Sequence, residues 1–89
     1  MNQIMIIDNA LDLGRRLRMD LLKYSEDLEI VVIPSAQEAL KEASQWRPDL
    51  VIADIRYRGM AGLDMVTNLR IHIKGVNVFI ITDGKDASL

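Results

Sequence analysis

Four short apolar runs recur along the chain, and each of them is rich in Ile or Val. They are residues 4–7, 30–33, 50–53 and 78–81. The runs are nearly continuous rather than alternating, which is typical of strands that are covered on both faces, as in parallel sheets. The pattern therefore predicts four buried strands.

Each gap between these runs carries a helical pattern of apolar residues spaced three or four apart. The residues are Leu13, Leu17 and Leu21 in the first gap, Ala36, Ala39, Leu40 and Ala43 in the second, and Leu63, Val66 and Leu69 in the third. Ser35 and Glu38 form a capping-box pattern, and Pro48 prevents the second helix from continuing. We expect Gly75 to end the third helix. This alternation predicts an α/β fold with a parallel sheet and right-handed crossovers.

Length and composition indicate one small domain and exclude several classes of site. The chain has 89 residues, a net charge of -2 and no cysteine. The charge gives no reason to expect nucleic-acid binding, and disulfides and thiolate metal sites are excluded. No apolar run approaches the ~20 residues that span a membrane. No secretory signal pattern precedes residue 4, so we expect a cytoplasmic protein.

Polar residues follow three of the predicted strands. Asp8 and Asn9 come after the first, Asp54 after the third and Thr82 after the fourth. Ligands of open parallel sheets bind beyond the carboxyl ends of the strands, where the strand order reverses. These residue types also serve structural roles, because acids and Asn after strands begin turns or cap helices, and Thr favours strands. Carboxylates and amide oxygens suit Mg²⁺, and a carboxylate beside Mg²⁺ can attack phosphorus.

Over nearly all of its length the chain resembles the receiver domain of two-component response regulators, of the chemotaxis-regulator type. The matching pieces are IMIIDN, RRLRMDLL, PSAQEALKEASQWRPDLVIAD, IRYRGMAGLDM and NVFIITDG. The resemblance implies a flavodoxin-like sheet in the order 2-1-3-4 and a histidine kinase as partner. It also implies Asp54 as phosphoacceptor and Thr82 as switch hydroxyl. The implied ligands of Mg²⁺ are Asp8, Asn9, Asp54 and the backbone carbonyl of Arg56.

The chain departs from the family pattern near the site. Asn9 stands where the family usually has a second acid, which lowers the expected affinity for Mg²⁺. Arg58 stands where the family often has Pro. Arg56 places a cation close to the site, where it would either pair with a phosphoryl group or compete with the metal.

The family pattern continues beyond the end of this sequence, which stops seven residues after Thr82. A receiver adds a helix, a fifth strand with a phosphate-binding Lys, and a last helix; Lys85 lies too close to Thr82 to match that Lys. We therefore expect one receiver-like domain, residues 1–89, that is incomplete at its C-terminus. The fourth strand would then form an exposed apolar edge, which predicts a homodimer or higher self-association.

The leading functional hypothesis is a receiver that accepts a phosphoryl group on Asp54 and is not an enzyme beyond hydrolysis of that group. The alternative is a degenerate receiver that acts as an interaction or dimerisation module. A phosphatase of the haloacid dehalogenase type would need an acid at position 56, which is Arg, and a flavodoxin-type protein is possible on fold alone. Arg15, Arg16 and Arg18 form either a solvated helix face or, by resemblance, a kinase-docking face. We expect a structural role for His72.

Overall fold

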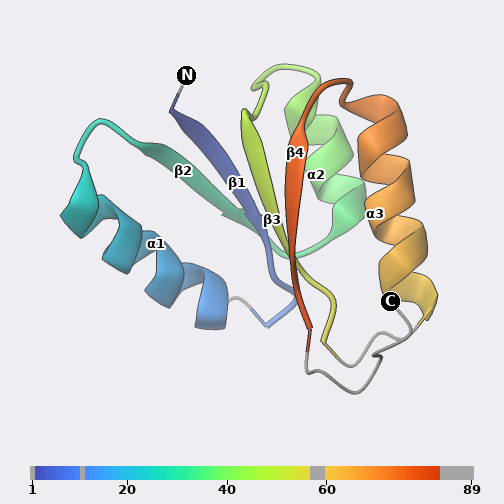
Figure 1. Ribbon diagram of the computed structural model, residues 1–89, viewed down its shortest axis with the longest axis horizontal. Coiled ribbons are helices and arrows are strands. Elements are labelled where there is room, and N and C mark those ends of the chain that lie inside the picture. Colours follow the sequence, from blue (N-terminus) through green and yellow to red (C-terminus); the bar gives the residue numbers. More distant parts are fainter. Residues whose placement is uncertain (1, 11, 57–59, 83–89) are drawn as a thin grey trace.

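The chain folds into a single sheet with helices on both faces (Figure 1). The computed structural model describes residues 2–10, 12–56 and 60–82. The predicted alternation of four strands and three helices is confirmed in this part of the chain. The elements are β1 (Gln3–Ile7), α1 (Asp12–Tyr24), β2 (Glu29–Ile33), α2 (Ala36–Ala43), β3 (Leu50–Asp54), α3 (Met60–His72) and β4 (Asn77–Ile81).

All strand pairs in the sheet are parallel, and the order is β2-β1-β3-β4. The predicted flavodoxin-like order is thus confirmed. In this order β2 lies on one side of β1 and β3 on the other, so the chain reverses its direction of winding between β1 and β3. The register pairs Ile7 with both Ile33 and Ala53, and Asp54 with Ile81. The carboxyl ends of β1, β3 and β4 therefore meet at one edge of the sheet.

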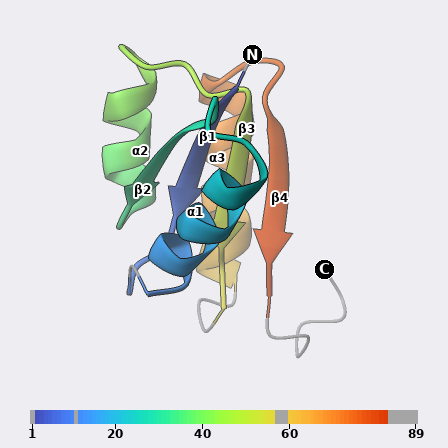
Figure 2. The same ribbon diagram turned by 90° about the vertical axis from the view of Figure 1, so that its left-hand side faces the viewer.

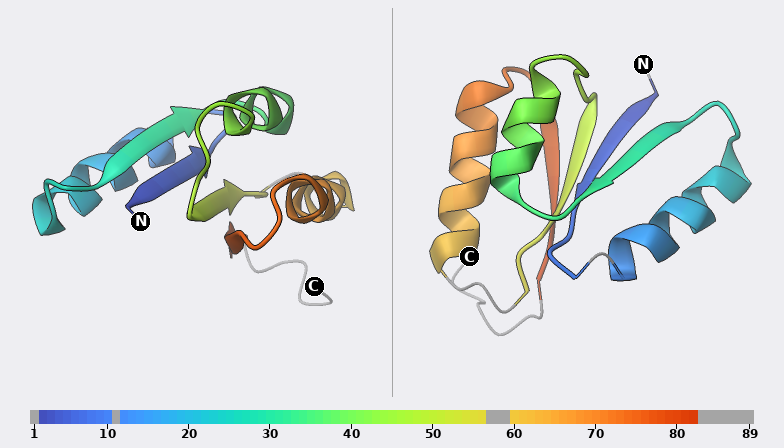
Figure 3. Two further views of the ribbon diagram at one scale, coloured as in Figure 1. Left: turned by 90° about the horizontal axis from the view of Figure 1, so that it is seen from above. Right: turned by 180° about the vertical axis from the view of Figure 1, so that it is seen from behind.

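The sheet separates two apolar clusters, which explains why its central strands are apolar on both faces (Figures 2 and 3). Met5, Ile7 and Val51 face α2 and α3, whereas Ile6 and Ile52 belong to the cluster on the α1 side. Side chains alternate between the two faces along each strand. Because helices cover both faces, both sets are buried and the runs read as continuous rather than alternating.

The boundaries of the second helix follow the local sequence. The Ser35 Oγ accepts a hydrogen bond from the Glu38 amide at 3.2 Å, as expected of an N-cap. At the other end, Trp46 packs against the core beneath α2 and α3, and Pro48 is buried. The third helix ends at His72, and Gly75 follows in the turn that leads to β4. Its φ of 77° is the left-handed conformation typical of a glycine after a helix.

The arginines of α1 are exposed, as expected of a solvated helix face, but one of them also contacts the sheet. The Arg18 Nε donates to the Ile30 carbonyl oxygen at 3.2 Å, which ties α1 to β2. None of the helices that the structure describes is both long and apolar enough to cross a membrane.

β4 forms one edge of the sheet, and its apolar side chains are poorly covered. Phe79 is 63% exposed and Ile80 is 40% exposed. The register pairs Phe79 with Ile52, which places Phe79 on the α1 side of the sheet. However, α1 packs against β1 and β2, toward the opposite edge of the sheet. The predicted apolar edge at the fourth strand is therefore present in the described part of the chain. The tail, including Lys85, lies outside the described residues.

Gly14 allows α1 to approach the sheet closely. A Cβ atom at this position would lie 2.7 Å from the Val32 Cγ1 and 3.3 Å from both the Asp8 Cβ and the Ile6 Cγ2. The contact with Val32 is shorter than any real Cβ contact, so a larger residue would push α1 away from β1 and β2.

We predict that Gly14→Ala destabilises the fold. Overpacking costs about 1–3 kcal/mol, and the better helix propensity of Ala returns only about 1 kcal/mol. Urea unfolding should show a net loss of about 1 kcal/mol. The control is Arg16→Ala on the exposed face of the same helix, which should stay within about 0.5 kcal/mol. A Gly14→Ala variant as stable as the unmodified chain would contradict the close approach.

Candidate functional site

Two acidic side chains are buried next to each other at the carboxyl edge of the sheet. Asp8 follows β1 directly, and Asp54 is the last residue of β3, the neighbouring strand. Their exposed fractions are 3% and 8%, and they are the only charged side chains buried among the described residues. Burying a carboxylate is costly unless hydrogen bonds or a cation compensate it. The surroundings of these two acids therefore define the site.

Asp8 is compensated by the backbone at the start of α1. Its Oδ2 accepts a hydrogen bond from the Gly14 amide at 2.8 Å, and its Oδ1 accepts one from the Ala10 amide at 3.2 Å. The Gly14 amide is among the first amides of α1, which have no acceptor within the helix. The positive end of the helix dipole also favours a carboxylate there. Asp8 thus orients the loop between β1 and α1, and it satisfies one of the first amides of α1.

Asp54 is compensated by Arg56, two residues further along the chain. The guanidinium forms a bidentate contact with the carboxylate: Nε lies 2.9 Å from Oδ1, and Nη2 lies 2.7 Å from Oδ2. The Arg56 amide also donates to Oδ1 at 3.0 Å. Such a two-pronged pair is stronger and more directional than a single hydrogen bond. The Arg56 side chain itself is 33% exposed, so the ion pair lies at the boundary between the sheet and solvent.

The pKa of Asp54 lies below its ordinary value. Burial raises this pKa, because desolvation penalises the charged form, but the hydrogen bonds and the positive charge of Arg56 more than offset that effect. Asp54 is therefore an ionised carboxylate at neutral pH, as a nucleophile or metal ligand must be.

The other predicted site residues lie at the same edge of the sheet. Asn9 is exposed and follows Asp8 in the turn that leads to α1. Thr82 is exposed and comes one residue after Ile81, the register partner of Asp54. The Ile55 amide donates to the Ile81 carbonyl at 2.9 Å, so the pairing of β3 and β4 extends to the level of the site. Arg58 lies outside the described residues, as do its neighbours at positions 57 and 59.

The donor set suits a hard divalent cation in chemistry, although it is small. Two carboxylates and main-chain carbonyls offer the oxygen ligands that Mg²⁺ prefers, with water completing the shell. Within the described ranges, no group of three or more His, Cys, Asp or Glu side chains is placed to hold a metal. The fit is therefore that of a site with few protein ligands and several waters. The Arg56 guanidinium, which the sequence placed only near the site, occupies the carboxylate that such a metal would share.

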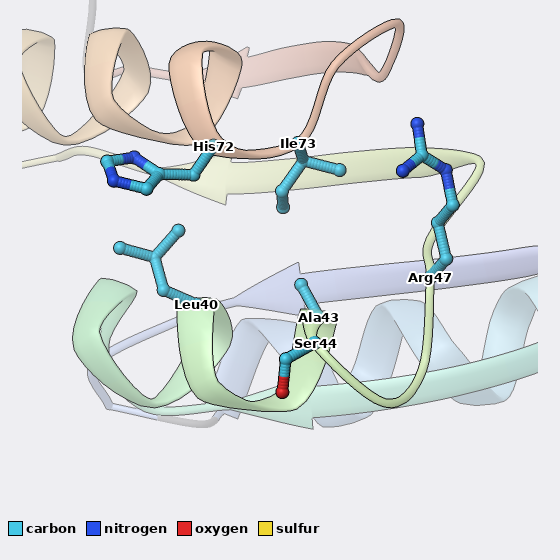
Figure 4. A pocket seen from close by; sticks show the side chains of 6 residues that line it. All are labelled: Leu40, Ala43, Ser44, Arg47, His72 and Ile73. Atoms are coloured by element: carbon cyan, nitrogen blue, oxygen red, sulfur yellow. The ribbon is translucent and has the colours of Figure 1, made fainter.

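A pocket of about 250 Å³ lies between α2 and α3, at the opposite end of the sheet from the acids, and Figure 4 shows its lining. Its lining residues are Leu40, Ala43, Ser44, Arg47, His72 and Ile73. His72 Nδ1 is 2.8 Å from the Asn68 carbonyl oxygen, and Arg47 is hydrogen-bonded to the Lys74 carbonyl. The polar groups of this pocket thus bond to helix and loop backbone, and no carboxylate lines it.

The comparisons with known proteins agree with this fold. The response regulator receiver domain family matches residues 4–89. Transcriptional regulatory protein LnrK of Bacillus subtilis is 31% identical over 93 aligned positions, which cover 100% of this chain and 40% of that protein. The nitrate/nitrite response regulator protein homolog of Haemophilus influenzae is 30% identical, over 90% of this chain and 38% of that protein.

Solved structures show the same architecture. The response regulator TrrA of Thermotoga maritima, in complex with Mg²⁺ and BeF, matches with a TM-score of 0.78 and 27% identity, over 100% of this chain and 77% of that chain. The response regulator MaeR, at 24% identity and a TM-score of 0.76 over 99% of this chain and 72% of that chain, shares the fold. The curated relatives are longer, and the chain spans 40% or less of the length of those cited above. The match over residues 4–89 nevertheless shows that the chain belongs to the response regulator receiver domain family.

Proposed function

We propose that this chain accepts a phosphoryl group on Asp54 from a histidine kinase. The observation that carries the proposal is a buried, ionised carboxylate at the carboxyl end of β3, beside a second buried acid, in a chain of the receiver family. One Asp54 oxygen would attack phosphorus as the bond from phosphorus to the kinase histidine breaks. The products are an acyl phosphate on Asp54 and a free histidine. We propose no turnover beyond hydrolysis of this acyl phosphate.

Mg²⁺ is the proposed cofactor, and it would supply neutralisation of the phosphoryl charge during transfer. The related TrrA was solved in complex with Mg²⁺ and BeF, which supports Mg²⁺ as a cofactor of this chain. Asp8, Asn9, Asp54 and the Arg56 carbonyl would hold the ion. Since Asn9 contributes a neutral amide where the family usually has an acid, we expect weak binding. Thr82, at the register level just beyond Asp54, would hydrogen-bond the bound phosphoryl group.

The alternative, a degenerate receiver that never carries phosphate, is not favoured by the family match. No contact among the described residues identifies the partner kinase or the process that the chain regulates. A cytoplasmic location and the absence of nucleic-acid binding stay predictions.

The proposed function predicts one new phosphoryl group on the chain. Incubation with Mg²⁺ and a small phosphodonor such as acetyl phosphate should add one phosphoryl mass, because the aspartate oxygen is ionised and the donor needs no docking surface. Intact-mass spectrometry would detect the product, and Asp54→Asn should abolish it. Asp64→Asn is the matched control, since Asp64 is exposed on α3. A folded chain that stays unmodified with Mg²⁺ and donor, or one that is modified equally in the Asp54→Asn variant, would contradict the proposal.

The ionisation of Asp54 predicts a pH-dependent contribution of Arg56 to stability. The pKa of Asp54 in the folded chain lies below its unfolded value, so the ion pair stabilises the fold above the unfolded pKa. This stabilisation is lost as the pH falls through the folded pKa. Arg56→Gln should therefore reduce the free energy of unfolding by about 1–3 kcal/mol at neutral pH, and the difference should shrink below about pH 4.

Urea unfolding of both chains at neutral and acidic pH would measure this difference. Arg70→Gln, which removes one exposed charge from the last turn of α3, is the control and should show no such pH dependence. A difference for Arg56→Gln that stays constant across the acidic range would show that the ion pair is not the source.

We also propose that the exposed edge at β4 drives self-association. Phe79 and Ile80 add apolar surface to a strand whose outer side has no partner strand among the described residues. Sedimentation velocity at micromolar concentration should therefore show dimers or larger species. Phe79→Lys should shift the distribution toward monomer, because a Lys on an edge strand opposes pairing. The control is Tyr24→Lys at a side chain that is 92% exposed on α1. A monomeric unmodified chain with a cooperative melt would sink the prediction.

A further inference from the structure

Every oxygen of the two buried carboxylates already has a hydrogen-bond donor from the protein. Asp8 is held by two backbone amides of the turn and helix that follow it. Asp54 is held by the backbone amide and the guanidinium of Arg56. Throughout the described residues, no buried side-chain nitrogen or oxygen lacks a partner. The hydrogen-bonding atoms of the two carboxylates thus all have protein partners.

The cation that pairs with Asp54 is Arg56, which is close to it in the sequence. Arg56 is two residues from Asp54, and its amide bonds to the same carboxylate, so the local turn aims the side chain back at the acid. The guanidinium keeps its charge at all physiological pH values, so deprotonation cannot release the pair. Its side chain is one-third exposed, so the guanidinium is in contact with solvent.

We propose that Arg56 is an internal cation that closes the Asp54 site in the resting chain and competes with the divalent cation for it. The inference rests on the proposed function, in which Asp54 needs one free oxygen for attack and one for the metal. In the structure the guanidinium holds both oxygens. A metal ion beside Asp54 would also experience repulsion from a guanidinium that stayed in place. The contact between Arg56 and Asp54 therefore opposes binding of the metal at Asp54.

This competition weakens the apparent affinity for the metal. When only a fraction of the molecules has the competent arrangement, the apparent dissociation constant is the intrinsic one divided by that fraction. If Arg56 is turned away from Asp54 in about a tenth of the molecules or fewer, the apparent dissociation constant for Mg²⁺ is raised about tenfold or more. Removing the guanidinium would restore the intrinsic affinity for Mg²⁺. In the unmodified chain, Arg56 therefore sets the Mg²⁺ concentration at which the metal displaces it from Asp54.

The test is a Mg²⁺ titration of the unmodified chain and of Arg56→Gln, followed by amide chemical shifts at Asp8 and Asp54 at constant ionic strength. We expect the apparent dissociation constant to fall about tenfold or more in Arg56→Gln. Arg56→Lys keeps the charge but loses the two-pronged contact, so an intermediate value is expected. This variant also carries the test if Arg56→Gln does not fold. Arg70→Gln, at the far end of the sheet, removes the same charge and should leave the constant unchanged.

The internal-cation proposal can fail independently of the proposed function, because the Mg²⁺ affinity is measured without phosphoryl transfer. An Arg56→Gln chain that binds Mg²⁺ no more tightly than the unmodified chain, or does not bind it at all, would overturn the internal-cation proposal, even if Asp54 is phosphorylated. An equal change in Arg70→Gln would also overturn it, because the effect would then be one of net charge. Tighter binding in Arg56→Gln alone would support it, even if no variant accepts phosphate and the proposed function falls.

Discussion

The burial of two carboxylates at the ends of neighbouring strands is the constraint on which the rest of this structure depends. Asp8 and Asp54 lie where helices cover both faces of the sheet, so water cannot fully solvate them. Each acid must therefore be compensated from within the chain, because an unpaired buried charge would cost more than the fold can supply. The start of α1 compensates Asp8, and Arg56 compensates Asp54.

The two compensations differ in how readily they can be undone. The amide bonds to Asp8 belong to the packing of α1 against the sheet, where Gly14 approaches Val32 closely, so breaking them would disturb the core. The bond to Asp54 comes from a flexible side chain at the boundary with solvent. Asp8 is thus held as part of the framework, whereas Asp54 can be released. This asymmetry suits a site in which one carboxylate reacts and its neighbour stays in place.

Much of the fold followed from local patterns, whereas the contacts between side chains required the structure. The strands, the helices and the parallel sheet were predicted from the sequence. Continuous apolar runs indicate buried strands, and Ser35 marks the start of a helix, without knowledge of distant contacts. The convergence of Asp8, Asp54 and Thr82 at one edge was also predicted, because a parallel sheet gathers its carboxyl ends. The sequence placed Arg56 near the site but left open which group it would contact. An arginine two residues from an acid can point many ways, and only the turn after β3 fixes its direction.

The sequence by itself determined which residues are apolar, where strands and helices alternate and which acids end the strands. These features follow from the periodicity of side chains along the backbone, which needs no knowledge of distant contacts. Only the tertiary structure decided that Asp8 satisfies the amides at the start of α1, that Gly14 must remain small, and that Arg56 grips both oxygens of Asp54. Each of these depends on distances between elements or on the course of a loop. Burial raises the energy of any unmet charge, so those distances determine which partner each carboxylate takes.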